Sequence, residues 1–169
     1  MGSPVESKDV EEPAKCGFFY GTLMAPEVFF TVCYDTKNVP EEVKKRHNFH
    51  EAILHGYCRR RVRNADYPGI TEDKEHTVRG IYVTGLSAHN MARLDFFEGS
   101  EYERRTVTVR LLEKIDKGDG TFELVEGEER TAEVYVFLPT GGLEGDEWDY
   151  EQFRREKMAY WTRAGYGFD

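Results

Sequence analysis

Residues 86–112, "LSAHNMARLDFFEGSEYERRTVTVRLL", join a helix pattern to a strand pattern through one glycine. Ser87 is a favoured N-cap residue, and Met91 and Leu94 recur at helical spacing. Gly99 is a typical helix stop, and beyond it the side chains alternate between two faces. One face carries Arg105, Val107, Val109 and Leu111, and the other carries Tyr102, Arg104, Thr106 and Thr108. The stretch predicts a helix followed by a half-buried strand, an order that suits an α+β domain.

Glu98 stands at the end of this helix, where the helix dipole disfavours a carboxylate by about 0.3–1 kcal/mol. The dipole, the nearby charge of Asp95 and the flanking Phe96 and Phe97 should raise the pKa of Glu98. A carboxylate with a raised pKa suits a general base, and the alternative is a solvated acid in an acid-rich chain. Glycoside hydrolysis is disfavoured because Asp95 and Glu98 share one helical turn instead of facing each other across a cleft.

The segment "CGFFYGTLMAPEVFFTVCYD", residues 16–35, predicts a strand, a turn at Gly21 and a helix that begins at Pro26. The loop 20–25, "YGTLMA", directs backbone N–H groups toward the start of that helix, a place that favours an anion. The alternative is an ordinary strand-to-helix turn, because one glycine is a weak signal. A further short helix is expected from Pro40.

Most of the remaining chain predicts short strands. The segments 52–62, 67–70 and 77–85 have strand character and are separated by polar turns at 63–66 and 71–75. Residues 131–138 are the expected antiparallel partner of 102–112, across a turn with two glycines. A last helix is predicted at residues 149–164. This order suggests an α+β domain built on a curled sheet or a small barrel.

Length and charge limit the organisation and the partners. The 169 residues predict one domain at residues 16–169, preceded by a polar, disordered tail at residues 1–15. A net charge of -9 argues against nucleic-acid binding, and no apolar run is long enough for a membrane span. The three cysteines indicate no disulfide framework, and no signal peptide is evident, so we expect a cytoplasmic protein.

Two clusters could suggest other functions. The potential zinc ligands His47, His50, His55 and Cys58 lie within twelve residues. His55 and Cys58 would point to opposite faces of one strand, so we expect satisfied or exposed side chains and no metal. The basic run 59–63, "RRRVR", is expected to supply ion-pair partners and not a nucleic-acid stripe. A cysteine nucleophile is not supported by spacing.

Taken in order, several segments resemble the gamma-glutamylcyclotransferase-like family, and in particular its avirulence-induced-gene-like branch from plants and fungi. They are "FFYGTLMAPEV", "LHGYCRRRV", "YPGI", "VRGIYVTGLS", "LDFFEGSEYERRTVTV", "AEVYVF" and "DEWDYEQFRR", which run from about Phe18 to Arg155. The resemblance implies an α+β fold, a small mixed or antiparallel β-barrel with surrounding helices.

The resemblance also implies a reaction in which the α-amine of a γ-glutamyl group attacks its own γ-carbonyl and releases 5-oxoproline and an amine or amino acid. Glu98 matches the family's catalytic acid/base, and no cofactor is implied. The expected substrate-binding residues are Tyr20, Gly21, Thr22, Leu23, Met24, Ala25, Tyr102 and Arg104, with Tyr67 and Tyr135 as further candidates. The leaving group and oligomeric state stay open. The alternative is a non-catalytic ligand-binding or stress-response interaction protein on the same fold.

Overall fold

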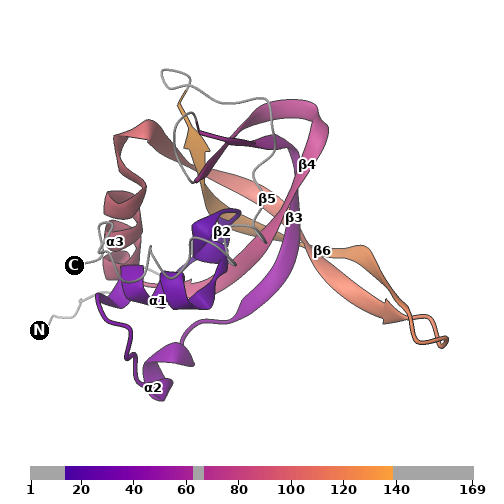
Figure 1. Cartoon of the computed structure of the whole chain (residues 1–169), viewed down its shortest axis with the longest axis horizontal. Coiled ribbons are helices and arrows are strands. Elements are labelled where there is room, and N and C mark those ends of the chain that lie inside the picture. Colours follow the sequence, from indigo (N-terminus) through magenta and orange to yellow (C-terminus); the bar gives the residue numbers. More distant parts are fainter. Residues whose placement is uncertain (1–13, 63–66, 139–169) are drawn as a thin grey trace, which may run out of the picture.

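The computed structural model describes residues 14–62 and 67–138, in which five strands form a closed barrel in the order β2-β4-β3-β5-β6 (Figure 1). The strands are β2 (Lys15–Phe19), β3 (Phe49–Arg61), β4 (Pro68–Leu86), β5 (Tyr102–Asp116) and β6 (Phe122–Phe137). All neighbouring pairs are antiparallel except β2 and β6, whose parallel contact between Gly17 and Glu133 closes the barrel. The α+β barrel expected from the sequence is confirmed, and its sheet is mixed.

Helices lie on one side of the barrel, and the far end of the β5–β6 hairpin projects from the other (Figure 1). The helical elements are η1 (Thr22–Met24), α1 (Pro26–Tyr34), α2 (Glu41–Lys44), α3 (Ala88–Glu98) and η2 (Gly99–Glu101). Pro26 opens α1, where its missing N–H costs nothing. Ser87 caps α3 in a reciprocal capping box with Asn90. The predicted helix starts at Pro26 and Ser87 are therefore confirmed.

The prediction of two strands separated by a polar turn at residues 71–75 is wrong, because β4 runs without a break through this segment. Thr71 pairs with Cys58 of β3. The register then jumps, so that residues 73–76 lie opposite Gly56, which adopts φ +87°. The polar residues form a bulge in a long strand, a device that bends a sheet and re-aims side chains. Sequence polarity alone does not separate such a bulge from a turn.

Two apolar cores hold the barrel and the helices together. The barrel interior contains Phe18, Leu54, Ile70, Val109 and Val134, among others. The second core lies between the barrel and the helices and contains Phe19, Val28, Phe29, Leu86 and Leu94, among others. Phe18 and Phe19 follow each other on β2 and so enter different cores, as strand alternation requires. Each such burial contributes about 1.5–3 kcal/mol, so β2 fixes the helices to the barrel.

Several expectations fall outside the described residues. These are most of the tail at residues 1–15, the turn at 63–66 and the helix at 149–164. The sheet begins at Lys15, one residue before the expected domain boundary. Among the described residues, no helix has the length and apolar character that crossing a membrane would need.

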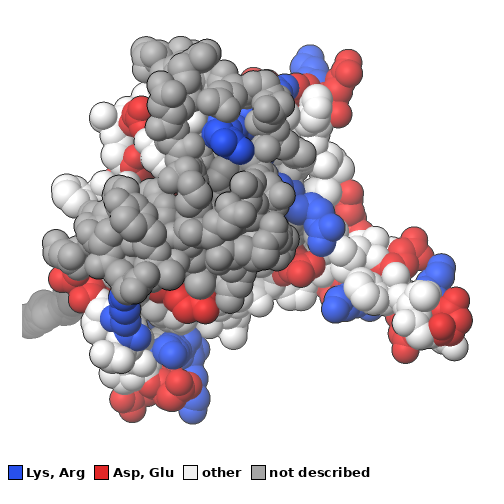
Figure 2. All heavy atoms as spheres, viewed as in Figure 1, with Lys and Arg blue, Asp and Glu red and all other residues white. Residues whose placement is uncertain are grey.

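Many charged residues on the described surface form ion pairs with neighbours of opposite sign. Figure 2 shows Lys and Arg interspersed with Asp and Glu along the projecting hairpin, where Lys117 pairs with Glu123 and Arg130 with Glu128. Within the basic run, Arg60 pairs with Asp73, whereas Arg59 donates to the backbone carbonyls of Tyr20 and Arg79. The ion-pair prediction therefore holds for Arg60, and Arg59 has a different role.

Candidate functional site

A cavity of about 300 Å³ opens between the end of β2, the start of β4 and the end of α3. Its walls are Phe18, Phe19, Tyr20, Gly21, Thr22, Leu23, Tyr67, Pro68, Phe97, Glu98, Tyr102 and Tyr135. The cavity therefore brings together Glu98 and four residues of the predicted loop, which lie far apart in the sequence. Met24 and Ala25 do not line it, and Ala25 instead lies in the core beside the helices.

The loop places the start of the helical turn η1 at this cavity, because Gly21, Thr22 and Leu23 line it. Within the described residues, the N–H groups of Gly21, Thr22 and Leu23 donate to no backbone carbonyl, as expected at the start of a helical turn. A Cβ atom on Gly21 would lie 2.8 Å from Cγ of Pro68, closer than real Cβ atoms approach. Glycine therefore lets the loop pack against β4, and the arrangement suits an anionic group.

Glu98 is the last residue of α3 and lies half-buried in the cavity wall. The next residue, Gly99, adopts φ +80°, which ends the helix at this point. Burial, and secondly the charge of Asp95, raises the pKa of Glu98 to about 8. Phe97 lines the cavity, but Phe96 is 77% exposed and adds no apolar cover. The expected rise in pKa is thus present, with burial as its main cause.

Four tyrosines surround the carboxylate, and their hydroxyl protons are directed to fixed acceptors. Tyr20 donates to the carbonyl of Tyr135 (2.6 Å), and Tyr102 donates to the carbonyl of Pro68 (2.7 Å). The hydroxyl of Tyr67 donates to Glu101 (3.2 Å). Burial raises the pKa of each tyrosine, and the Glu98 carboxylate raises it further, so all stay protonated near neutral pH. Because each hydroxyl proton is already donated in a hydrogen bond, the hydroxyl oxygens can act mainly as acceptors toward a ligand. Such acceptors suit an ammonium or amine group.

Asp95 stands outside the cavity and connects it to Arg104. Its Oδ1 accepts a 2.7 Å hydrogen bond from the hydroxyl of Tyr135, and its Oδ2 lies 3.2 Å from the Arg104 guanidinium. Arg104 also pairs with Glu133 at 3.4 Å. The expectation that Arg104 lines the pocket is therefore not met, because its charge is drawn to two acids outside. It is linked to the cavity through Asp95, which accepts from Tyr135.

Replacing Asp95 by Asn should lower the pKa of Glu98. The substitution removes the negative charge that helps to raise that pKa, while the amide oxygen can still accept from Tyr135. The titration of Glu98 can be followed by carboxyl-carbon NMR in protein labelled at glutamate. Wild type should titrate near pH 8, the Asp95→Asn variant lower, and Asp116→Asn, on the projecting hairpin, as wild type. An unchanged midpoint in Asp95→Asn would show that the charge of Asp95 is screened from Glu98.

The four histidine and cysteine candidates do not form one metal site. His47 contacts the hydroxyl of Tyr34 and the carbonyl of Thr84, and burial lowers its pKa. His50 contacts the carbonyl of Leu112, and His55 contacts Glu126. Each histidine is therefore satisfied locally, as expected, and Cys58 lies apart from all three.

Two residues that shape the cavity are absent from the predicted site. Pro68 packs against Gly21 and accepts from Tyr102, and Arg59 donates a 2.9 Å hydrogen bond to the carbonyl of Tyr20. Arg59 belongs to a basic run that indicates surface charge, and Pro68 is typical of a strand start. Neither residue type signals a site in the sequence, because each acts by holding another residue in place.

Comparison with known proteins agrees with this architecture. The family model described as "Gamma-glutamyl cyclotransferase, AIG2-like" matches residues 17–161. AIG2-like protein C of Arabidopsis thaliana is 31% identical over 140 residues, which cover 82% of this chain and 68% of the relative. Protein AIG2 C of the same plant is 29% identical over 140 residues, covering 81% and 70%.

Solved structures show the same fold. A solution structure of an Arabidopsis thaliana protein is 26% identical, has a TM-score of 0.58, and is matched over 91% of this chain and 81% of that one. A structure of a gamma-glutamyl cyclotransferase is 15% identical, has a TM-score of 0.51, and is matched over 78% and 70%. The barrel, the flanking helices and the cavity thus place the protein in a class of small α+β barrel proteins. The chain belongs to the gamma-glutamyl cyclotransferase, AIG2-like family.

Proposed function

We propose that the protein is a γ-glutamyl cyclotransferase-type enzyme that converts a small γ-glutamyl amide into 5-oxoproline and a free amine or amino acid. The observation that carries the proposal is that a half-buried glutamate with a raised pKa shares one cavity with Gly21, Thr22 and Leu23, which stand at the start of a helical turn. A γ-glutamyl group carries an α-carboxylate and an α-amine on the same carbon. The cavity offers anion-binding donors for the first and acceptors for the second.

The reaction moves two protons from the attacking nitrogen to the leaving nitrogen. The α-amine is an ammonium group near neutral pH and must lose its first proton before it attacks the γ-carbonyl. Glu98 as a carboxylate accepts that proton and passes it to the leaving nitrogen. The new C–N bond closes a five-membered ring as the amide C–N bond breaks. The ring nitrogen then gives up its second proton through Glu98 to the released amine, which departs as an ammonium ion. Atoms and charges balance without a cofactor or added water.

The surroundings of Glu98 support this role. A glutamate with a pKa of about 8 accepts a proton from an ammonium group more readily than an ordinary glutamate does, because the two pKa values lie closer together. The loop would hold the α-carboxylate, and the oxygens of Tyr20, Tyr102 and Tyr135 would face the ammonium group. Fixing both ends brings the amine close to its own carbonyl, the proximity on which a ring closure depends.

A panel of γ-glutamyl compounds tests the proposal and the nature of the leaving group together. Glutathione, γ-glutamyl amino acids and γ-glutamylamines are incubated with the protein, and 5-oxoproline is measured by mass spectrometry. The expected result is turnover of at least one class, with kcat/KM rising as Glu98 loses its proton around pH 8 and falling again at higher pH as the substrate amine loses its own. If no compound is cleaved but some bind, the protein is a ligand-binding member of the family and not an enzyme.

A further inference from the structure

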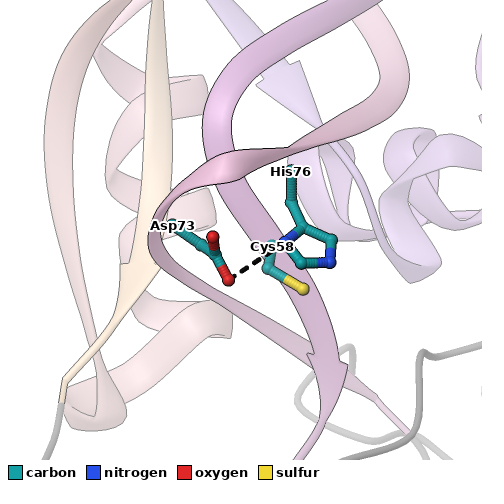
Figure 3. A group of neighbouring side chains, drawn as sticks. All are labelled: Cys58, Asp73 and His76. Atoms are coloured by element: carbon teal, nitrogen blue, oxygen red, sulfur yellow. Dashed lines mark ion pairs between the residues drawn. The ribbon is translucent and has the colours of Figure 1, made fainter.

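We propose that Cys58, Asp73 and His76 form a zinc-binding site on the barrel wall, separate from the cavity. One potential ligand atom from each residue lies within 4.8 Å of the other two. Figure 3 shows the three side chains converging from two adjacent strands, Cys58 from β3 and the other two from β4. None of the three lines the cavity, so the site is independent of the proposed cyclotransferase reaction.

The bulge in β4 creates this arrangement. Residues 73–76 leave the regular register opposite Gly56, and Asp73 and His76 stand at the two ends of the bulge. In an uninterrupted strand, residues three apart would point to opposite faces. Here Oδ2 of Asp73 lies 3.0 Å from Nδ1 of His76 (Figure 3). The backbone N–H of Glu75 donates to Oδ1 of Asp73, which orients the carboxylate and leaves Oδ2 directed at His76.

The donor set suits zinc. Thiolate, imidazole and carboxylate are its usual protein ligands, at about 2.3 Å for sulfur and about 2.0–2.2 Å for nitrogen and oxygen. Tetrahedral ligands at these lengths stand about 3.3–3.6 Å apart, so side-chain shifts of a few tenths of an ångström up to about 1 Å would complete the site. Cys58 is 3% exposed, whereas the His76 side chain is 51% exposed. The ion would enter from the histidine side, with water as its fourth ligand.

The positive charge of Arg60 opposes the binding of zinc. The guanidinium of Arg60 lies 3.8 Å from Oδ2 of Asp73, the same oxygen that would bind zinc. A bound cation must therefore compete with Arg60 for that oxygen.

Cobalt(II) provides the direct test, because thiolate ligation and tetrahedral geometry give it characteristic absorption bands. The reduced, metal-free full chain is titrated with Co²⁺ near neutral pH, and Zn²⁺ is then added. We expect a thiolate-to-cobalt band and strong visible bands that Zn²⁺ removes. Cys58→Ser should abolish the thiolate band, and His76→Ala should weaken binding at least about tenfold. Because His76 is exposed, its loss should not disturb folding, which keeps the test valid if Cys58→Ser is unstable.

Two further variants sharpen the result. His55→Ala is the matched control, because His55 also contacts a carboxylate, that of Glu126, and should bind cobalt as wild type does. Arg60→Gln should tighten binding severalfold by removing the competing cation. A wild-type protein without the thiolate band, or a band that survives in Cys58→Ser, would overturn the site. Unchanged or weaker binding by Arg60→Gln would remove Asp73 from the ligand set and so overturn the three-residue site as well.

Discussion

Glu98→Gln is expected to lower kcat for 5-oxoproline release by about 10²–10⁴-fold, the usual contribution of a positioned general acid and base. Glutamine has nearly the same shape, so the cavity and its tyrosines should stay in place, but its amide can neither accept nor return the proton. KM should change little, because the backbone groups that would hold the substrate are unaltered. Steady-state kinetics on the best substrate of the panel measures both values.

The stability of the same variant separates lost chemistry from lost structure. The pKa of Glu98 is about 8 in the folded protein, against an ordinary value of 4.5. Below pH 4.5, Glu98 is mainly protonated in both the folded and the unfolded protein. Between pH 4.5 and 8, Glu98 is mainly deprotonated in the unfolded chain but mainly protonated in the folded protein. Wild type therefore loses stability as pH rises through this window. The neutral amide of the variant carries no such penalty, so Glu98→Gln should be more stable than wild type by ~1–3 kcal/mol near pH 8 and equal to it near pH 4.

Chemical denaturation at the two pH values measures this difference. The measurement at the lower pH is the internal control, because both proteins are uncharged at this position there. Full activity in Glu98→Gln would remove Glu98 from the mechanism. A variant that is inactive and also less stable at the higher pH would indicate that the glutamate has a structural role and that its loss damages the fold.

The sequence predicts those parts of the fold that depend on local patterns. Alternation in residues 102–112 and the capping serine at Ser87 indicate a strand and a helix by themselves, and both are present. The polar segment 71–75 is wrongly predicted as a turn because a bulge is defined by its partner strand, and here the partner residue is Gly56, far away in sequence. Pairing across strands is a tertiary property that no local pattern contains.

The residues of the candidate site also divide into those that a local sequence pattern predicts and those that it does not. Glu98 and Gly21 stand out because each is locally unusual, an acid at the negative end of a helix and a glycine between a strand and a helix. Arg104 does not line the cavity. Strand alternation predicts the face on which its side chain lies but not its ion-pair partners, and Asp95 and Glu133 hold its guanidinium outside the cavity. Pro68 and Arg59 escape prediction because they act by holding neighbouring cavity residues and have no chemistry of their own.

Gly21→Ala is expected to lower kcat/KM by about 10–100-fold without unfolding the protein. The new methyl group would lie 2.8 Å from Cγ and 2.9 Å from Cδ of Pro68, and the proline ring cannot rotate away. The loop must therefore shift by several tenths of an ångström, which moves the N–H groups proposed to hold the α-carboxylate relative to Glu98. Misplacement of about 1 Å can cost about 10²-fold in rate, so the loss should appear in kcat as well as in KM, because the loop is proposed both to bind the α-carboxylate and to position the amine for ring closure.

Gly127→Ala is the matched control for this variant. Its Cβ would approach Cγ of the Glu113 side chain at 3.1 Å, and a flexible, exposed side chain can move aside. The control should therefore keep wild-type kinetics, although both variants add one methyl group at a glycine. If Gly21→Ala also kept wild-type kinetics, the loop would not hold the substrate. If only KM rose, the loop would bind the substrate without positioning its amine for ring closure, because uniform binding changes KM at constant kcat.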